Sequence, residues 1–91
     1  MTIHLTKPMS LNGEAVSELA LNFDALTGAD LVAAESEARA MGDNTPFIAA
    51  SMRYQAAVAA RMAGCPVDDI LDLPAEDFKN IIAPVVRFLL A

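Results

Sequence analysis

Several residue types are scarce in this sequence, and each scarcity argues against a class of structure or partner. The single cysteine, Cys65, cannot form an internal disulfide, which is typical of proteins that fold in a reducing compartment. Lysine and arginine number 6 against 12 aspartates and glutamates, so the formal net charge is −6. Because nucleic acids and anionic membranes are bound through basic side chains, this balance argues against both kinds of partner.

Long hydrophobic runs are also missing. The apolar residues near the C-terminus are interrupted by Arg87, so no run is long enough to cross a bilayer, and the first residues lack the hydrophobic core of a secretory signal. Hydrophobic residues are nevertheless 55% of the chain. Since a chain of 91 residues buries only about 60–65% of its unfolded surface, we expect apolar surface to remain for a partner or a second copy.

Alternating apolar and polar residues over residues 2–6 and 17–23 predict two strands. The pair Asn12 and Gly13 between them is a strong signal for a chain reversal, so the runs form a β-hairpin with a long or bulged connection. A lone hairpin is marginally stable in water, and its apolar face should therefore cover helices. The residues expected on that face are Ile3, Leu5, Leu19, Leu21 and Phe23.

Residues 45–64 carry the signals of a central helix. Thr45 can cap the first turn with its hydroxyl, and Pro46 suits the first helical position, where no N–H is needed. Gly64 can adopt the left-handed conformation that ends a helix. Because the helix has little polar surface, we expect it to be packed from more than one side. The residues expected on its apolar face are Phe47, Ile48, Met52, Tyr54, Val58, Ala59 and Met62.

Other helices are expected on both sides of this segment. Thr27 and Asp30 have nearly the spacing of a capping box, which starts a helix that runs to about Met41. A short helical turn is expected over residues 67–71.

The last helix begins near Pro74, and Pro84 inside its apolar pattern should kink or break it near Asn80. The expected fold class is therefore α+β. It consists of an N-terminal β-hairpin followed by three main α-helices plus a short helical turn, in a single domain over residues 1–91.

No residues with catalytic or metal-binding spacing are found. Cys65 and His4 could in principle act as nucleophile and base, but a reactive thiol needs an activating environment that the pattern does not supply. A calcium loop needs alternating oxygen ligands and a turn glycine, whereas apolar residues interrupt the acids before the last helix. We expect no catalytic, cofactor or metal site. The acids concerned are Asp68, Asp69, Asp72, Glu76 and Asp77.

Two other interpretations can be weighed from the pattern alone. Residues 59–78 have the central glycine of a helix-turn-helix, but the second helix would carry acids where phosphate contacts belong. A ligand pocket could form among Phe47, Met52, Tyr54 and Met62, although side chains at helical spacing are more typical of a core.

The order of these signals along nearly the whole chain resembles the small tail assembly chaperones of tailed bacteriophages and prophages. The most specific features are a Thr-Gly-x-Asp-Leu helix start at Thr27 and a Leu-Pro-x-x-Asp-Phe helix start at Leu73. Val16 departs from the aromatic residue that is frequent two positions before the Glu-Leu pair in the family. The segments that carry the resemblance are residues 3–8, 12–13, 18–21, 27–31, 61–66 and 70–78.

The resemblance implies a non-enzymatic protein made in the host bacterial cytoplasm during phage assembly. Such proteins coat the tape-measure protein, keep it soluble and help to recruit tail-tube subunits, and they are generally absent from the mature virion. The resemblance therefore names the tape-measure protein as a partner and the major tail-tube protein as a further one.

The residues also support this interpretation, because a holdase needs exposed apolar surface together with net charge. A helical adaptor or regulatory module with an unrelated partner is the alternative that the same composition allows. The residues expected to bind a client or a second copy are Ile82, Val85, Val86, Phe88, Leu89 and Leu90.

Overall fold

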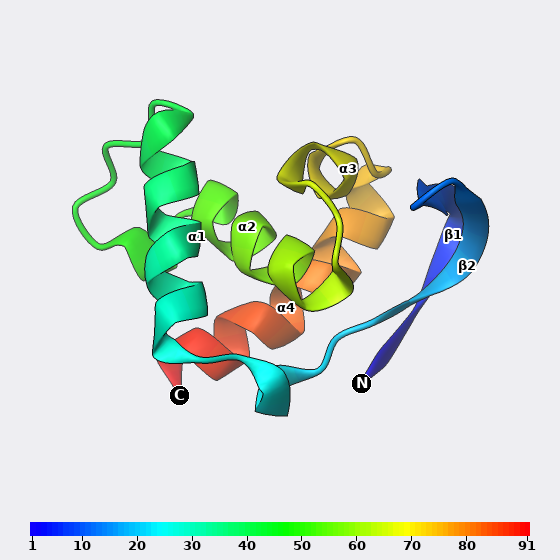
Figure 1. The fold of residues 1–91 in the computed structure, drawn as a ribbon, viewed down its shortest axis with the longest axis horizontal. Coiled ribbons are helices and arrows are strands. Elements are labelled where there is room, and N and C mark those ends of the chain that lie inside the picture. The colour runs from blue at the N-terminus through cyan, green and yellow to red at the C-terminus, as the bar shows by residue number, and fades with distance from the viewer.

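The computed structural model describes all of residues 1–91, and its architecture is the expected α+β arrangement (Figure 1). An antiparallel hairpin lies at one side, and the helices form the rest of the molecule (Figure 1). The elements in chain order are β1 (Thr2–Leu11), β2 (Glu14–Ala20), the 3-10 turn η1 (Phe23–Ala25), α1 (Gly28–Ala40), the 3-10 turn η2 (Ile48–Ala50), α2 (Met52–Ala63), α3 (Val67–Leu71) and α4 (Ala75–Leu90).

The hairpin turns where the sequence indicates, but its connection is short. Asn12 and Gly13 have φ angles of 52° and 86°, which allows a tight two-residue turn and lets Leu11 pair with Glu14. Of the long or bulged connection that the sequence left open, the structure has the bulged form, as a register shift within β1 between His4 and Met9. The second strand ends at Ala20, so Phe23 belongs to η1 and not to the sheet.

The irregular part of β1 is held by a buried carboxylate instead of by β2. The backbone N–H and the hydroxyl of Thr6 donate to the two carboxylate oxygens of Asp77, at 2.8 and 2.9 Å. Asp77 lies in the first turn of α4 and is fully buried. The hydrogen bond from the Thr6 backbone, with help from the Lys7 backbone and against the effect of burial, lowers the pKa of Asp77. This contact fixes the hairpin to the helices.

Helix α2 is central, as predicted, and is buried on all sides. Seven consecutive residues from Tyr54 to Ala60 are buried, and α2 contacts α1, α3 and α4. The many alanines explain this position, because short side chains allow neighbouring elements to approach. Gly64 ends α2 with φ 75°, as expected.

The predicted start of α2 is wrong by six residues. The helix begins at Met52 with Ser51 as its N-cap, and the backbone N–H of Tyr54 donates to the Ser51 hydroxyl oxygen at 3.3 Å. Thr45 and Pro46 lie in the preceding loop. Phe47 and Met52, expected on the apolar face, are instead 64% and 66% exposed.

Helices α1 and α4 agree with their sequence signals, and of the kink or break expected at Pro84 the break does not occur. Thr27 and Asp30 form the capping box of α1. Helix α4 continues without interruption through Pro84. Pro84 leaves the carbonyl of Asn80 without its helical donor, but Asn80 is exposed, so water can reach it.

One apolar cluster joins the hairpin to the helices. None of the helices is long and apolar enough to traverse a lipid bilayer. The largest fully buried apolar side chains of the cluster are Leu19, Leu21, Val58, Ile70, Ile81 and Val85.

Candidate protein-binding surface

The six residues proposed from the sequence lie on the C-terminal half of α4 and differ in exposure. Val85 is fully buried and Ile82 is 8% exposed, so both belong to the core of this chain. The other four reach the surface, and we refer to them together as the C-terminal surface. Phe88 is 42% exposed, Leu90 is 50% exposed, and Val86 and Leu89 are half-buried.

The exposed ring of Phe88 is held in place by a second aromatic residue. Its centroid lies 5.0 Å from that of Phe23 in η1, with 39° between the ring planes. Such tilted pairs are favourable beyond the area that they bury. The end of α4 is therefore attached to the segment that links the hairpin to α1, and the outer part of the Phe88 ring is presented on a supported helix.

Five further large apolar side chains are exposed at positions that the sequence analysis did not propose for protein binding. They are Met1, Val32, Phe47, Met52 and Leu71. Val32 on α1 is 64% exposed, and Phe47 and Met52 lie on either side of η2. Helical spacing suggested that Phe47 and Met52 are buried in the core. Their exposure to solvent follows only once α2 is known to begin at Met52. The molecule thus exposes apolar side chains on more than one element.

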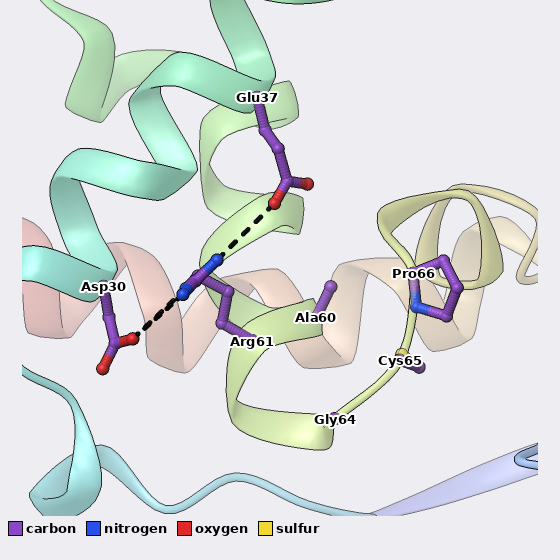
Figure 2. A pocket seen from close by; sticks show the side chains of 7 residues that line it. All are labelled: Asp30, Glu37, Ala60, Arg61, Gly64, Cys65 and Pro66. Carbon is purple, nitrogen blue, oxygen red and sulfur yellow. Dashed lines mark hydrogen bonds and ion pairs between the residues drawn. The ribbon is translucent and has the colours of Figure 1, made fainter.

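A shallow depression of about 390 Å³ between α1 and the end of α2 is lined by three charged side chains together with small and apolar residues (Figure 2). Arg61 lies between two carboxylates of α1, with 3.2 Å from Nη2 to Asp30 Oδ1 and 3.7 Å from Nη1 to Glu37 Oε1. Hydrogen bonds from Thr27 and from Arg61 lower the pKa of Asp30. The two ion pairs of Arg61 link α1 to α2, and Arg61 thereby has partners within the chain. Two carboxylates facing one guanidinium leave a net charge of −1 at the depression.

Cys65, beside this depression, does not have the environment of a nucleophile. Burial, together with the nearby charge of Asp69, raises the pKa of the Cys65 thiol. His4 lies on the exposed side of the hairpin with Nδ1 3.3 Å from Glu18 Oε1. The structure therefore gives neither side chain the partner that the nucleophile–base interpretation requires.

The acidic residues between α3 and α4 separate into different roles. Asp77 holds the hairpin, and Glu76 forms an ion pair with Lys79 at 3.1 Å. Asp69 and Asp72 line a depression of about 420 Å³ that also contains Lys7. No group of three or more histidine, cysteine, aspartate or glutamate side chains is placed to hold a metal ion.

The structure supports neither the helix-turn-helix nor the ligand pocket that the sequence analysis considered. In the helix-turn-helix interpretation the second helix would be α3, which has only five residues and carries Asp68 and Asp69 in its first turn. A pocket among Phe47, Met52, Tyr54 and Met62 does not form, since Phe47 and Met52 face solvent whereas Tyr54 is buried. The exposed apolar side chains are the remaining candidates for a functional surface.

Comparison with protein-family models identifies a family that covers almost the whole chain. A family model described as "Phage tail assembly chaperone proteins, E, or 41 or 14" matches residues 2–90. No curated protein and no solved structure matches the chain. The family match covers the hairpin and all of the helices described above.

Proposed function

We propose a specific role for this chain, which belongs to the family of phage tail assembly chaperones. The chain binds the tape-measure protein of the same phage, keeps it soluble before the tail is built, and helps to bring tail-tube subunits to it. The observation that carries this proposal is the C-terminal surface, an exposed apolar edge on the last helix of a strongly acidic chain.

The physical basis is reversible burial of client apolar surface. The C-terminal surface offers partly exposed apolar area to an amphipathic helix of the client. The net charge of −6 keeps the complex in solution. Four side chains are far fewer than the roughly 20–30 residues per side of a stable protein interface, so each copy binds weakly. Several copies along one client then supply the required affinity.

Ile82 and Val85 contribute to this proposed site in an indirect way. Both are buried in the chain itself, and they anchor α4 so that the C-terminal surface is presented at a fixed position. Self-association of copies bound side by side on a client would use the same edge. We propose further that residues 1–91 act as one domain, that the role involves no catalysis, cofactor, nucleic acid or membrane, and that the protein works in the host cytoplasm and leaves before the virion is mature.

Co-expression with the tape-measure protein of the same phage tests this proposal. We expect the tape-measure protein to remain in the soluble fraction only when this chain is present, and the two to elute together with several copies of the chain per client. The double variant Phe88→Ser with Leu90→Ser should retain the circular dichroism spectrum of the wild type and lose most of the soluble client.

Val32→Ser is the matched control, because it also replaces an exposed apolar side chain with serine but lies on α1. It should leave the amount of soluble client unchanged. A client that stays insoluble with the wild-type chain, which then elutes alone, would contradict the proposal and favour an adaptor with an unrelated partner. Equal loss in the control and in the double variant would remove the C-terminal surface from the proposal.

A further inference from the structure

The N-terminal side of α2 contains two complete start signals, and the structure uses only the second. Ser51 caps the observed helix. Six residues earlier, Thr45 followed by Pro46 has the cap and first residue of a longer helix, and the residues between the two starts include good helix formers. Residues 46–51 separate the two starts, and in the structure they form a loop with the 3-10 turn η2 in place of a helix.

A network centred on Asp43 selects the second start. The Ser51 hydroxyl donates to Asp43 Oδ2, and the backbone N–H of Thr45 donates to Asp43 Oδ1 at 2.8 Å. Arg39 Nη1 donates to the backbone carbonyls of Asp43 and Thr45 at 3.2 and 2.7 Å. Asp43 is 5% exposed, so its hydrogen bonds are shielded from water. Together these contacts hold the backbone of residues 43–51 away from the helical path.

The longer helix would change the position of Phe47. Positions 47, 54 and 58 are separated by seven and four residues, so they share one face of a continuous helix. Tyr54 and Val58 are buried on that face in the structure, whereas Phe47 is 64% exposed. Extension of α2 would therefore move Phe47 out of the loop and into line with the buried side chains of Tyr54 and Val58.

The observed loop and the extended helix are each stabilised by contacts that the other lacks. The observed one keeps Ile48 and Ala49 packed against the core and lets Gln55 Nε2 donate to the Ala49 carbonyl at 2.8 Å. The extended one gives up these contacts and gains helical hydrogen bonds and the burial of an aromatic ring. The hydrogen bonds of Asp43 stabilise the observed loop further.

We propose that residues 46–51 form a two-state element in which the Asp43 network keeps Phe47 displayed, and in which release of that network extends α2 and withdraws Phe47. The element is a property of the isolated chain and does not depend on the chaperone proposal.

Hydrogen exchange of two amides distinguishes extension from simple loosening of the loop. In the structure the backbone N–H groups of Met52 and Arg53 are the first of α2, and neither donates to another group of the chain. In the extended helix they would donate to the carbonyls of Ile48 and Ala49, four residues earlier. We expect Asp43→Ala to slow the exchange of both amides, and a tenfold slowing would correspond to an extended population of about 90%.

Ser51→Ala provides a second route to the same state, since it removes the observed cap and the hydroxyl partner of Asp43 while placing a good helix former at a buried position. In both variants the Cα chemical shifts of Phe47 and Ile48 should move toward helical values. Adding Thr45→Ala to Asp43→Ala removes the alternative cap and should restore fast exchange.

Asp30→Asn is the matched control, because it weakens the cap of α1 and should leave the exchange of Met52 and Arg53 unchanged. Fast exchange of these two amides in folded Asp43→Ala and Ser51→Ala chains would overturn the proposal. Slow exchange that persists after Thr45→Ala is added would also overturn it, because the protection would then have another origin.

Discussion

Two substitutions on α4, Val85→Ala and Leu90→Ser, separate the folding role of this helix from its proposed binding role. Val85 is fully buried, so losing two methyl groups costs the transfer free energy of these groups and leaves a cavity, together about 2–3 kcal/mol. Leu90 is 50% exposed, and burial of half a leucine side chain contributes only about 1 kcal/mol. Since a chain of this size has roughly 5–14 kcal/mol of stability, both variants remain folded.

Thermal unfolding followed by circular dichroism measures the first effect, and soluble client in the co-expression experiment measures the second. Val85→Ala should lower Tm by about 10–20 °C and Leu90→Ser by about 4–8 °C. Well below either Tm, Leu90→Ser should lose more soluble client than Val85→Ala does. A Tm for Leu90→Ser as low as that of Val85→Ala would place Leu90 in the core, and a greater loss of client with Val85→Ala would refute the assignment of the two roles.

Three further predictions concern stability and reactivity. Gly64→Ala should cost about 1–2 kcal/mol of unfolding free energy in urea titrations, because φ is 75° and no neighbouring atom compensates for the strain. Hydrogen bonds from Ser51 and Thr45 lower the pKa of Asp43 to about 2, so the ionised carboxylate contributes its full stabilisation above the ordinary pKa of 3.8 and loses it as the pH falls from about 4 to 2. Asp43→Asn should therefore flatten the pH dependence of Tm between these two pH values. An unchanged slope of Tm against pH would contradict this account. Cys65 should react with iodoacetamide more slowly than a cysteine in an unfolded peptide at about pH 8, because its thiol pKa is raised, and equal rates would show that the thiol is not shielded.

The parts of the fold that depend on neighbouring residues could be predicted from the sequence. Asn12 and Gly13 mark the hairpin turn, Thr27 and Asp30 cap α1, and Gly64 ends α2. Each signal is contained within about four residues, so no knowledge of the tertiary structure is needed to interpret it. The order of elements and the α+β class follow from signals of this kind.

The errors arise where side-chain hydrogen bonds, some between neighbouring residues and some across the chain, decide the backbone conformation. Thr45 and Pro46 are a valid helix start, but Arg39 and Asp43 hold that segment in a loop and Ser51 takes over the cap. In the same way, nothing near Asp77 in the sequence indicates that its carboxylate binds the backbone of Thr6, 71 residues away. Contacts of this range are not visible in hydrophobic periodicity.

The candidate surface could be predicted only in part. Helical spacing shows that α4 has more apolar residues than one buried stripe needs, and this excess correctly points to Phe88 and Leu90 as exposed. It does not show that Ile82 and Val85 turn inward, since that depends on how α4 lies against α2. The exposure of Phe47 could not be predicted, because the sequence placed this residue inside α2 and the helix begins at Met52.

The central claim, that the C-terminal surface binds the client, is tested most directly by hydrogen exchange of α4 with and without the tape-measure protein. The co-purified complex and the free chain would be compared at the same pH and temperature. The account predicts slower exchange for the amides from Val86 to Leu90 in the complex, with no change in α1 around Val32. Unchanged exchange at the end of α4, with protection elsewhere, would contradict it and would move the binding surface to the protected element.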